Sequence, residues 1–175
     1  MLIENIGWLI LRSTNMGQYR YSRNIEASLI DYITAQLAIA GWSDINVEKG
    51  FARVYSSEVP VICIRLSDTT HSPAEIGSNA TYRIPLIFVD IFGSSDGNRL
   101  DLKDFLVSIF KNNIAYYDYT IANGVVSVKT RNGSIDVIDI KDSPINFDTN
   151  KNELAIQDRY RHLLTLTVDL GRLET

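Results

Sequence analysis

The sequence contains few of the residues that cross-link a fold or bind a metal. Only one of its 175 residues is cysteine and two are histidine, which excludes an internal disulfide and a zinc site built on cysteine pairs. Cys63 lies inside the apolar run 61–64, a context that predicts a buried thiol. The HExxH, GxSxG, Walker A and GxGxxG patterns are absent as well. The sequence therefore carries no signature of a zinc protease, a serine hydrolase, a P-loop protein or a dinucleotide-binding domain.

No long hydrophobic segment is present either. The longest apolar stretch near the start, Ile6–Leu11, falls well short of the roughly 20 residues of a membrane span. Glu4 is the only charged residue before it, whereas a signal peptide begins with basic residues. These absences predict a protein with no membrane partner that is made and used in the cytoplasm or released from it.

Basic residues are in the minority, since 17 lysines and arginines stand against 21 acidic residues and give a net charge of −4. Such a chain does not bind polyanions through bulk charge unless its basic residues cluster. The composition is 45% hydrophobic and 22% charged, which is typical of a globular domain and excludes a disordered, collagen-like or coiled-coil chain.

Two stretches have the apolar periodicity of amphipathic helices. In residues 22–40, Ile25, Leu29, Ile33 and Leu37 recur every fourth position, with Ser22 or Asn24 as the N-cap and Gly41 just after the end. Residues 99–111 form the second predicted helix, with Asp96 or Asn98 as its cap.

Strands are predicted at 45–55, 58–67, 80–92 and 160–170 from runs or alternation of apolar residues. The polar stretch 69–79 is predicted to be a long loop, so that strands 58–67 and 80–92 form a protruding hairpin with this loop as its tip. Arg131-Asn132-Gly133 predicts a turn between strands 125–129 and 134–140. Residues 142–152 are predicted to be a polar loop.

The order of these elements predicts an α+β fold in a single domain, residues 1–175. A mostly antiparallel sheet carries two amphipathic helices on one face, and a long hairpin protrudes from it. Residues 1–21 are an N-terminal arm or a short strand, and residues 125–140 are an added hairpin.

One pattern suggests catalysis. Asp139-Ile140-Lys141 matches the D-x-K half of a metal-dependent nuclease site, in which carboxylates and a lysine hold Mg²⁺ and polarise water. Asp118 or Asp136 would have to supply the second carboxylate. Asp101-Leu102-Lys103 fits the same template by chance, so alternating charges on the solvent face of a hairpin are the simpler explanation. We therefore expect no enzyme, no cofactor and no metal.

Two segments have the composition of an interface. In the predicted loop the candidate residues are Thr70, His71, Ser72, Pro73, Glu75 and Ile76. Before the first helix, Tyr19, Arg20, Tyr21 and Arg23 interleave aromatic and basic side chains. This mixture occurs in single-stranded nucleic-acid sites and in protein interfaces, and the acidic net charge favours an interface. Residues 116–119 hold three tyrosines, either an exposed patch or part of the core.

The order of elements resembles that of the tail terminator proteins of long-tailed bacteriophages, also called tail completion or head–tail joining proteins. The resemblance covers about residues 22–170 and is one of pattern. It rests on helix 22–40, strand 59–66, the hairpin into 82–92, the helix Asp101–Phe110, the tyrosine segment 116–119 and the final strand 161–170. No residue of this family is catalytic, so the resemblance transfers no catalytic residue.

The resemblance implies a structural virion protein of the tail end, or neck. Six copies would form a homohexameric ring that is assembled in the host cytoplasm, caps the tail tube protein and stops its polymerisation. The ring would also contact the head-side connector or head completion protein, and DNA would pass through it without specific binding. A net acidic subunit suits such passage. Two alternatives remain open: a small nuclease that uses Asp139 and Lys141, and a monomeric adaptor that binds a peptide at a sheet edge.

Overall fold

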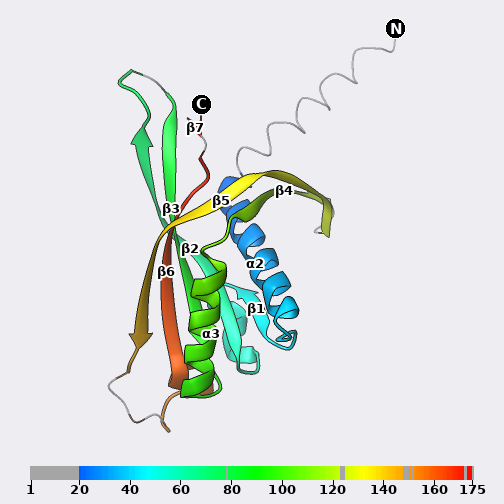
Figure 1. Ribbon diagram of the computed structural model, residues 1–175, viewed down its shortest axis with the longest axis vertical. Coiled ribbons are helices and arrows are strands. Elements are labelled where there is room, and N and C mark those ends of the chain that lie inside the picture. Colours follow the sequence, from blue (N-terminus) through cyan, green and yellow to red (C-terminus); the bar gives the residue numbers. More distant parts are fainter. Residues whose placement is uncertain are drawn as a thin grey trace.

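Two α-helices lie against a strongly curved, mostly antiparallel sheet (Figure 1). The computed structural model describes residues 20–77, 79–122, 125–147, 150, 152–171 and 173–174. The elements in chain order are α2 (Tyr21–Ile39), β1 (Asn46–Lys49), η2 (Phe51–Ser56), β2 (Val61–Pro73), β3 (Thr81–Phe92), α3 (Asp96–Ile109), β4 (Ile114–Ala122), β5 (Val125–Ile145), η3 (Ile156–Tyr160), β6 (Arg161–Asp169) and β7 (Leu173–Glu174).

The sheet has the strand order β1-β2-β3-β6-β5-β4. Strand β7 pairs with the first two residues of β3, Thr81 and Tyr82. Among the described strands, only β1 and β2 pair in parallel, and all the other strand pairs are antiparallel. The long strand β5 has two partners, because residues 125–135 pair with β4 and residues 136–145 pair with β6. Strand β5 therefore carries the sheet from its central part out to the β4–β5 hairpin, which extends over α2 in Figure 1.

Helix α2 confirms the helix predicted at residues 22–40. Its buried residues include the four apolar residues of the predicted stripe, from Ile25 to Leu37. The predicted cap is wrong: Arg20 is the N-cap residue, and no side chain caps the helix there. Gly41 follows the end with φ of 81°, the left-handed conformation that the sequence indicates.

Helix α3 begins earlier than predicted, at Asp96, because Ser95 is its cap. Ser95 has extended backbone, and its side chain accepts a hydrogen bond from the Asn98 N–H at 3.2 Å. The Asn98 side chain in turn accepts from the Ser94 N–H at 3.2 Å. The predicted caps Asp96 and Asn98 are thus already inside the helix, and a reciprocal pair of side chains fixes its start.

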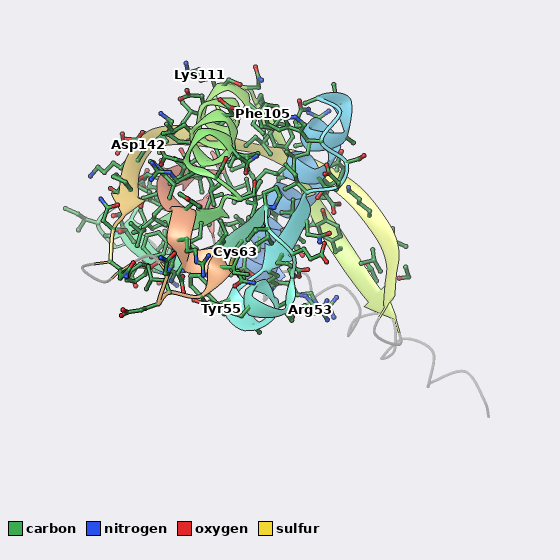
Figure 2. The ribbon with its side chains drawn as sticks, turned by 90° about the horizontal axis from the view of Figure 1, so that it is seen from below. Arg53, Tyr55, Cys63, Phe105, Lys111 and Asp142 are labelled. Atoms are coloured by element: carbon green, nitrogen blue, oxygen red, sulfur yellow. The ribbon has the colours of Figure 1, made fainter. Side chains whose placement is uncertain are left out.

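Both helices cover the same face of the sheet. Their buried side chains form one core cluster with strand residues of a single parity, among them Ile87, Val89, Leu164 and Leu166. A smaller cluster under η2 fills part of the opposite face with Val54, Val61, Cys63 and Phe92. Figure 2 shows α3 with Phe105 on one side of the sheet and η2 with Tyr55 on the other. This arrangement confirms the α+β fold with two helices on one face, and it also confirms the buried Cys63 thiol.

Two predictions in this part of the sheet are wrong in extent. The strand predicted at 45–55 ends at Lys49, because Gly50 turns the chain with φ of 68° into η2. The polar loop predicted from residue 142 starts only after Ile145. Strands 80–92 and 160–170 are confirmed by β3 and β6.

The predicted hairpin turn at Arg131-Asn132-Gly133 is also wrong, because β5 runs through it without reversing. Ala115 pairs with Ser134 and Tyr117 with Arg131, so Asn132 and Gly133 together lie opposite the single residue Tyr116. This is a β-bulge, and Gly133 has the positive φ of 114° that such an irregularity accommodates. Residues 125–140 are therefore one strand and do not form an added hairpin.

Candidate assembly surfaces

The β2–β3 hairpin continues beyond the core as an arm, which we define as residues 69–73 of β2, residues 81–85 of β3 and their connection. The paired residues run from Thr69 with Pro85 to Pro73 with Thr81. Thr70, His71, Ser72 and Pro73 are thus strand residues, and the prediction that they lie in a loop is wrong. The protruding hairpin itself is confirmed and is visible at the upper left of Figure 1.

The tip of the arm is a short turn. The Ala74 N–H donates to the Ala80 carbonyl at 2.8 Å, and Gly77 has φ of 84°. Glu75 and Ile76 precede this glycine and are both exposed, Ile76 with a relative exposure of 107%. Of the predicted interface residues in the arm, these two lie at its tip.

The outer edge of β2 is open along the arm. Strand β1 pairs only with residues 61–64, and the Leu66 N–H is bound by the Glu26 carboxylate at 2.8 Å. In the part of the chain that the structure describes, no strand pairs with this edge further out. An open edge made of serine and threonine backbone can accept another strand.

The aromatic and basic residues before α2 divide into different roles, and Tyr19 lies outside the described residues. Arg20 donates through Nη1 to the Tyr119 carbonyl on β4 at 3.4 Å. The Tyr21 ring lies 5.0 Å from the Arg83 guanidinium, and Arg83 pairs with His71 in the arm. Arg20 and Tyr21 therefore attach α2 to the sheet, while Arg23 is exposed.

A second arm, the β4–β5 hairpin, was not predicted from the sequence. Its outer residues Val126 and Val128 are 51% and 53% exposed. On its other face, Asp31 of α2 accepts a hydrogen bond from the Tyr119 hydroxyl at 2.8 Å and pairs with the Lys129 ammonium. Burial and this carboxylate raise the pKa of Tyr119. The sequence offers a signal for it, because the Asn-Gly pair at 123–124, which lies outside the described residues, stands between these two strands in the sequence.

The tyrosines of segment 116–119 belong mainly to the core and do not form an exposed patch. Tyr116 and Tyr119 are buried and Tyr117 is partly buried. Their strand, β4, packs against α2 and not under the second helix. Tyr116 belongs to the main core cluster, and its ring centroid lies 6.4 Å from that of Tyr21.

A buried ion cluster lies on the sheet face opposite the helices. The fully buried Asp90 carboxylate accepts from Arg161 Nη2 at 2.8 Å and from Arg161 Nε at 3.1 Å. Its other oxygen lies 3.5 Å from Arg65 Nε. Asp90 is paired in register with Cys63, and burial together with this carboxylate raises the pKa of the thiol to about 12. The cluster joins β2, β3 and β6.

Each arginine of this cluster is also packed against aromatic rings. The Arg65 guanidinium carbon lies 4.7 Å from the Phe51 centroid and 4.4 Å from that of Phe88. Arg161 lies 4.9 Å from the Phe51 ring and contacts Asp158 at 3.6 Å. Asp158 also accepts from the Tyr55 hydroxyl, and this carboxylate together with burial raises the pKa of Tyr55. These contacts hold both guanidinium groups in fixed orientations.

The residues of the nuclease hypothesis are not assembled into a site. Asp139 and Lys141 are exposed on β5. Asp118 accepts from the Asn24 side chain at 3.0 Å, and Asp136 accepts from Asn113 at 3.2 Å. Among the described residues, no group of three or more His, Cys, Asp or Glu side chains is placed to hold a metal ion.

The two histidines lie in unrelated places. His71 is exposed in the arm, with Arg83 as its cross-strand neighbour. His162 is buried on β6, and among the described residues neither ring nitrogen has a hydrogen-bond partner, although Asp142 Oδ2 lies 3.9 Å from Nε2. Burial and the nearby Arg99 guanidinium lower its pKa.

Comparison with known proteins adds no family assignment, because no family model and no curated protein matches this chain. Within the described residues, no helix is both long and apolar enough to cross a membrane.

Proposed function

We propose that this chain is a structural virion protein of a long-tailed bacteriophage, a tail terminator or neck ring subunit. It caps the completed tail tube, ends polymerisation of the tube protein and joins the tail to the head-side connector. It has no catalytic role. The resemblance of its element order to tail terminators motivates this proposal, and the confirmed α+β fold with a protruding hairpin agrees with it.

The β2–β3 arm is the observation that supports the proposal most. It extends beyond the core, leaves an open edge on β2 and ends in the fully exposed Ile76. An exposed isoleucine at the end of a projecting arm is available for contact with another molecule. The β4–β5 hairpin adds a second projecting surface, and a ring of identical subunits needs two different surfaces on each copy.

Charge supports the passage of DNA through such a ring. Each chain has a net charge of −4, so six copies would carry about −24, and like charge keeps DNA from adhering.

The test is light scattering and negative-stain imaging of the purified chain, alone and after mixing with cognate tail tubes. A ring with about six times the subunit mass of 19.7 kDa, or capped tubes that no longer grow, is the expected result. A monomer that leaves tube growth unchanged would overturn the proposal.

The open edge of β2 also favours one alternative, a monomeric adaptor that binds an extended peptide as an added strand. That function predicts a complex of one chain with one peptide, and no ring at any protein concentration.

A further inference from the structure

The described residues cover only part of the sheet face opposite the helices. The strand registers place its residues in rows that cross from β2 to β5. The row nearest η2 contains Cys63, Asp90, Leu163 and Ser143, and the next row contains Arg65, Phe88, Thr165 and Lys141. Leu86 and Thr167 belong to the following row, toward the arm. We call the residues of these last two rows the open face: Arg65, Phe88, Thr165, Lys141, Leu86 and Thr167.

Neither α-helix covers the open face, because the core that contains α2 and α3 uses strand residues of the other parity. The cluster under η2 includes Cys63 and Phe92 but no residue of the open face. Phe88, Leu86, Thr165 and Thr167 remain partly accessible, and Lys141 is exposed. Figure 2 shows η2 beneath only one part of the sheet.

The Arg65 guanidinium group is held in an orientation that suits the binding of a carboxylate on this face. Phe51 and Phe88 lie on its guanidinium group, and Asp90 is 3.5 Å from its Nε. The side chain is still 34% exposed. A guanidinium group that is already ordered loses little conformational freedom on binding, and arginine is common among residues that dominate interface energy. Lys141 adds a second positive charge in the same row, with one acid, Asp139, in the next.

The tip of the arm has the complementary chemistry. Glu75 supplies a carboxylate, and Ile76 beside it supplies the most exposed large apolar side chain among the described residues. A chain cannot place this tip on its own open face, because β2 and β3 connect the two. At about 3.3 Å per residue, the strands from the Arg65–Phe88 pair to the Pro73–Thr81 pair hold them more than about 20 Å apart, across the β-bulge between Leu66 and Thr69. The tip of another copy has no such constraint and can reach this face.

We propose that the arm tip of one copy docks on the open face of the next, with Glu75 against Arg65 and Lys141 and with Ile76 against Phe88 and Leu86. The two surfaces are different, so the contact is heterologous, the kind of contact that forms a ring when the rotation between successive copies closes. This inference deepens the proposed function, on which it rests, by identifying the contact between ring subunits.

Cross-linking between engineered cysteines tests the contact directly. Ile76→Cys and Thr165→Cys are purified separately, mixed and treated with a short bismaleimide, while the native Cys63 is buried. The contact predicts a mixed cross-linked dimer. The matched control replaces Ile76→Cys by Val128→Cys, an exposed position on the other arm. A yield no higher than that of the control, at concentrations up to those that form oligomers, would overturn the contact.

Charge exchange provides a second test that leaves the buried ion cluster intact. Glu75→Lys and Lys141→Glu should each weaken self-association at least tenfold, and the double variant should recover most of the loss. Arg65 is not changed, because it contacts Asp90 and its loss could unfold the chain. Equal self-association of all four proteins would refute the pairing.

The two proposals fail in different ways. Rings that cap tubes without the 76–165 cross-link would refute the docking contact and leave the proposed function standing. A specific cross-link in a protein that never caps tubes would support the contact and refute the terminator function.

Discussion

Ser28 on α2 accepts a hydrogen bond from the backbone N–H of Tyr117 on β4 at 3.0 Å. Nearby, Asn24 donates to the Asp118 carboxylate at 3.0 Å, and Arg20 donates to the Tyr119 carbonyl at 3.4 Å. Helix α2 thus lies along the outer edge of β4 and binds groups that another strand would otherwise bind. The helix covers the core and also protects one edge of the sheet from pairing with other chains.

Replacing Ser28→Ala should lower the free energy of unfolding by about 1–2 kcal/mol, because the partly buried Tyr117 N–H loses its acceptor. Urea unfolding followed by circular dichroism measures the change. Ser22→Ala is the matched control on the same helix, since Ser22 is exposed, and it should change stability by less than about 0.5 kcal/mol. Equal effects of the two substitutions would show that this hydrogen bond contributes little.

Asp90→Asn should destabilise the fold much more, by about 3 kcal/mol, because a buried charge partner is removed from Arg161 and Arg65. The asparagine amide group cannot accept at both oxygen positions, so it also places a donor against an arginine donor. Thermal and urea unfolding measure the loss, with Asp101→Asn, an exposed aspartate on α3, as control. A loss no larger than that of the control would mean that the cluster is not a source of stability.

The single thiol, Cys63, should be unreactive in the folded protein. It is fully buried, and burial beside Asp90 raises its pKa to about 12, so almost no thiolate forms at pH 8. Ellman's reagent should release about one equivalent of thiolate only after denaturant is added. Thr165→Cys serves as the positive control, because its new thiol lies on the open face and should react at once. Rapid reaction of the native protein would contradict the burial of Cys63.

The elements that could be predicted from sequence are those that bury a face. Helix α2 and strands β3 and β6 leave a periodic apolar pattern because one side of each contacts the core. The outer part of β2, from Thr69 to Pro73, has no such pattern. It is paired with β3 outside the core, so hydrogen bonding maintains it as a strand while both of its faces stay polar. Local polarity therefore predicted a loop.

The two Asn-Gly pairs show why the position of the β4–β5 hairpin could not be predicted from the sequence. The sequence has one pair at 123–124 and another at 132–133, and each favours positive φ. Strands β4 and β5 are connected across the first pair, while the second forms the bulge opposite Tyr116. An Asn-Gly pair suits both a hairpin turn and a bulge, so the choice between them depends on long-range strand pairing, which the local sequence does not encode. The rows of the open face depend on the same registers.

His162 should make the fold less stable below about pH 6.5, where a histidine with the ordinary pKa takes up a proton. Its pKa is lowered in the folded protein, chiefly by burial and by Arg99, with Lys103 also opposing the charged form and Asp142 favouring it. The unfolded chain therefore binds a proton that the folded chain does not, so the free energy of unfolding falls as pH falls from 6.5 toward the lower folded value. The slope for this one group is at most about 1.4 kcal/mol per pH unit.

Urea unfolding between pH 7.5 and pH 5 measures this dependence. His162→Leu places an apolar side chain of similar size under α3 and removes the titrating ring. The stability of this variant should therefore fall less over this pH range than that of the native protein. His71→Gln is the matched control, because His71 is exposed in the arm, and it should keep the native dependence. If His162→Leu lost stability as steeply as the native chain, the acid sensitivity would belong to the carboxylates, and the buried imidazole would have no part in it.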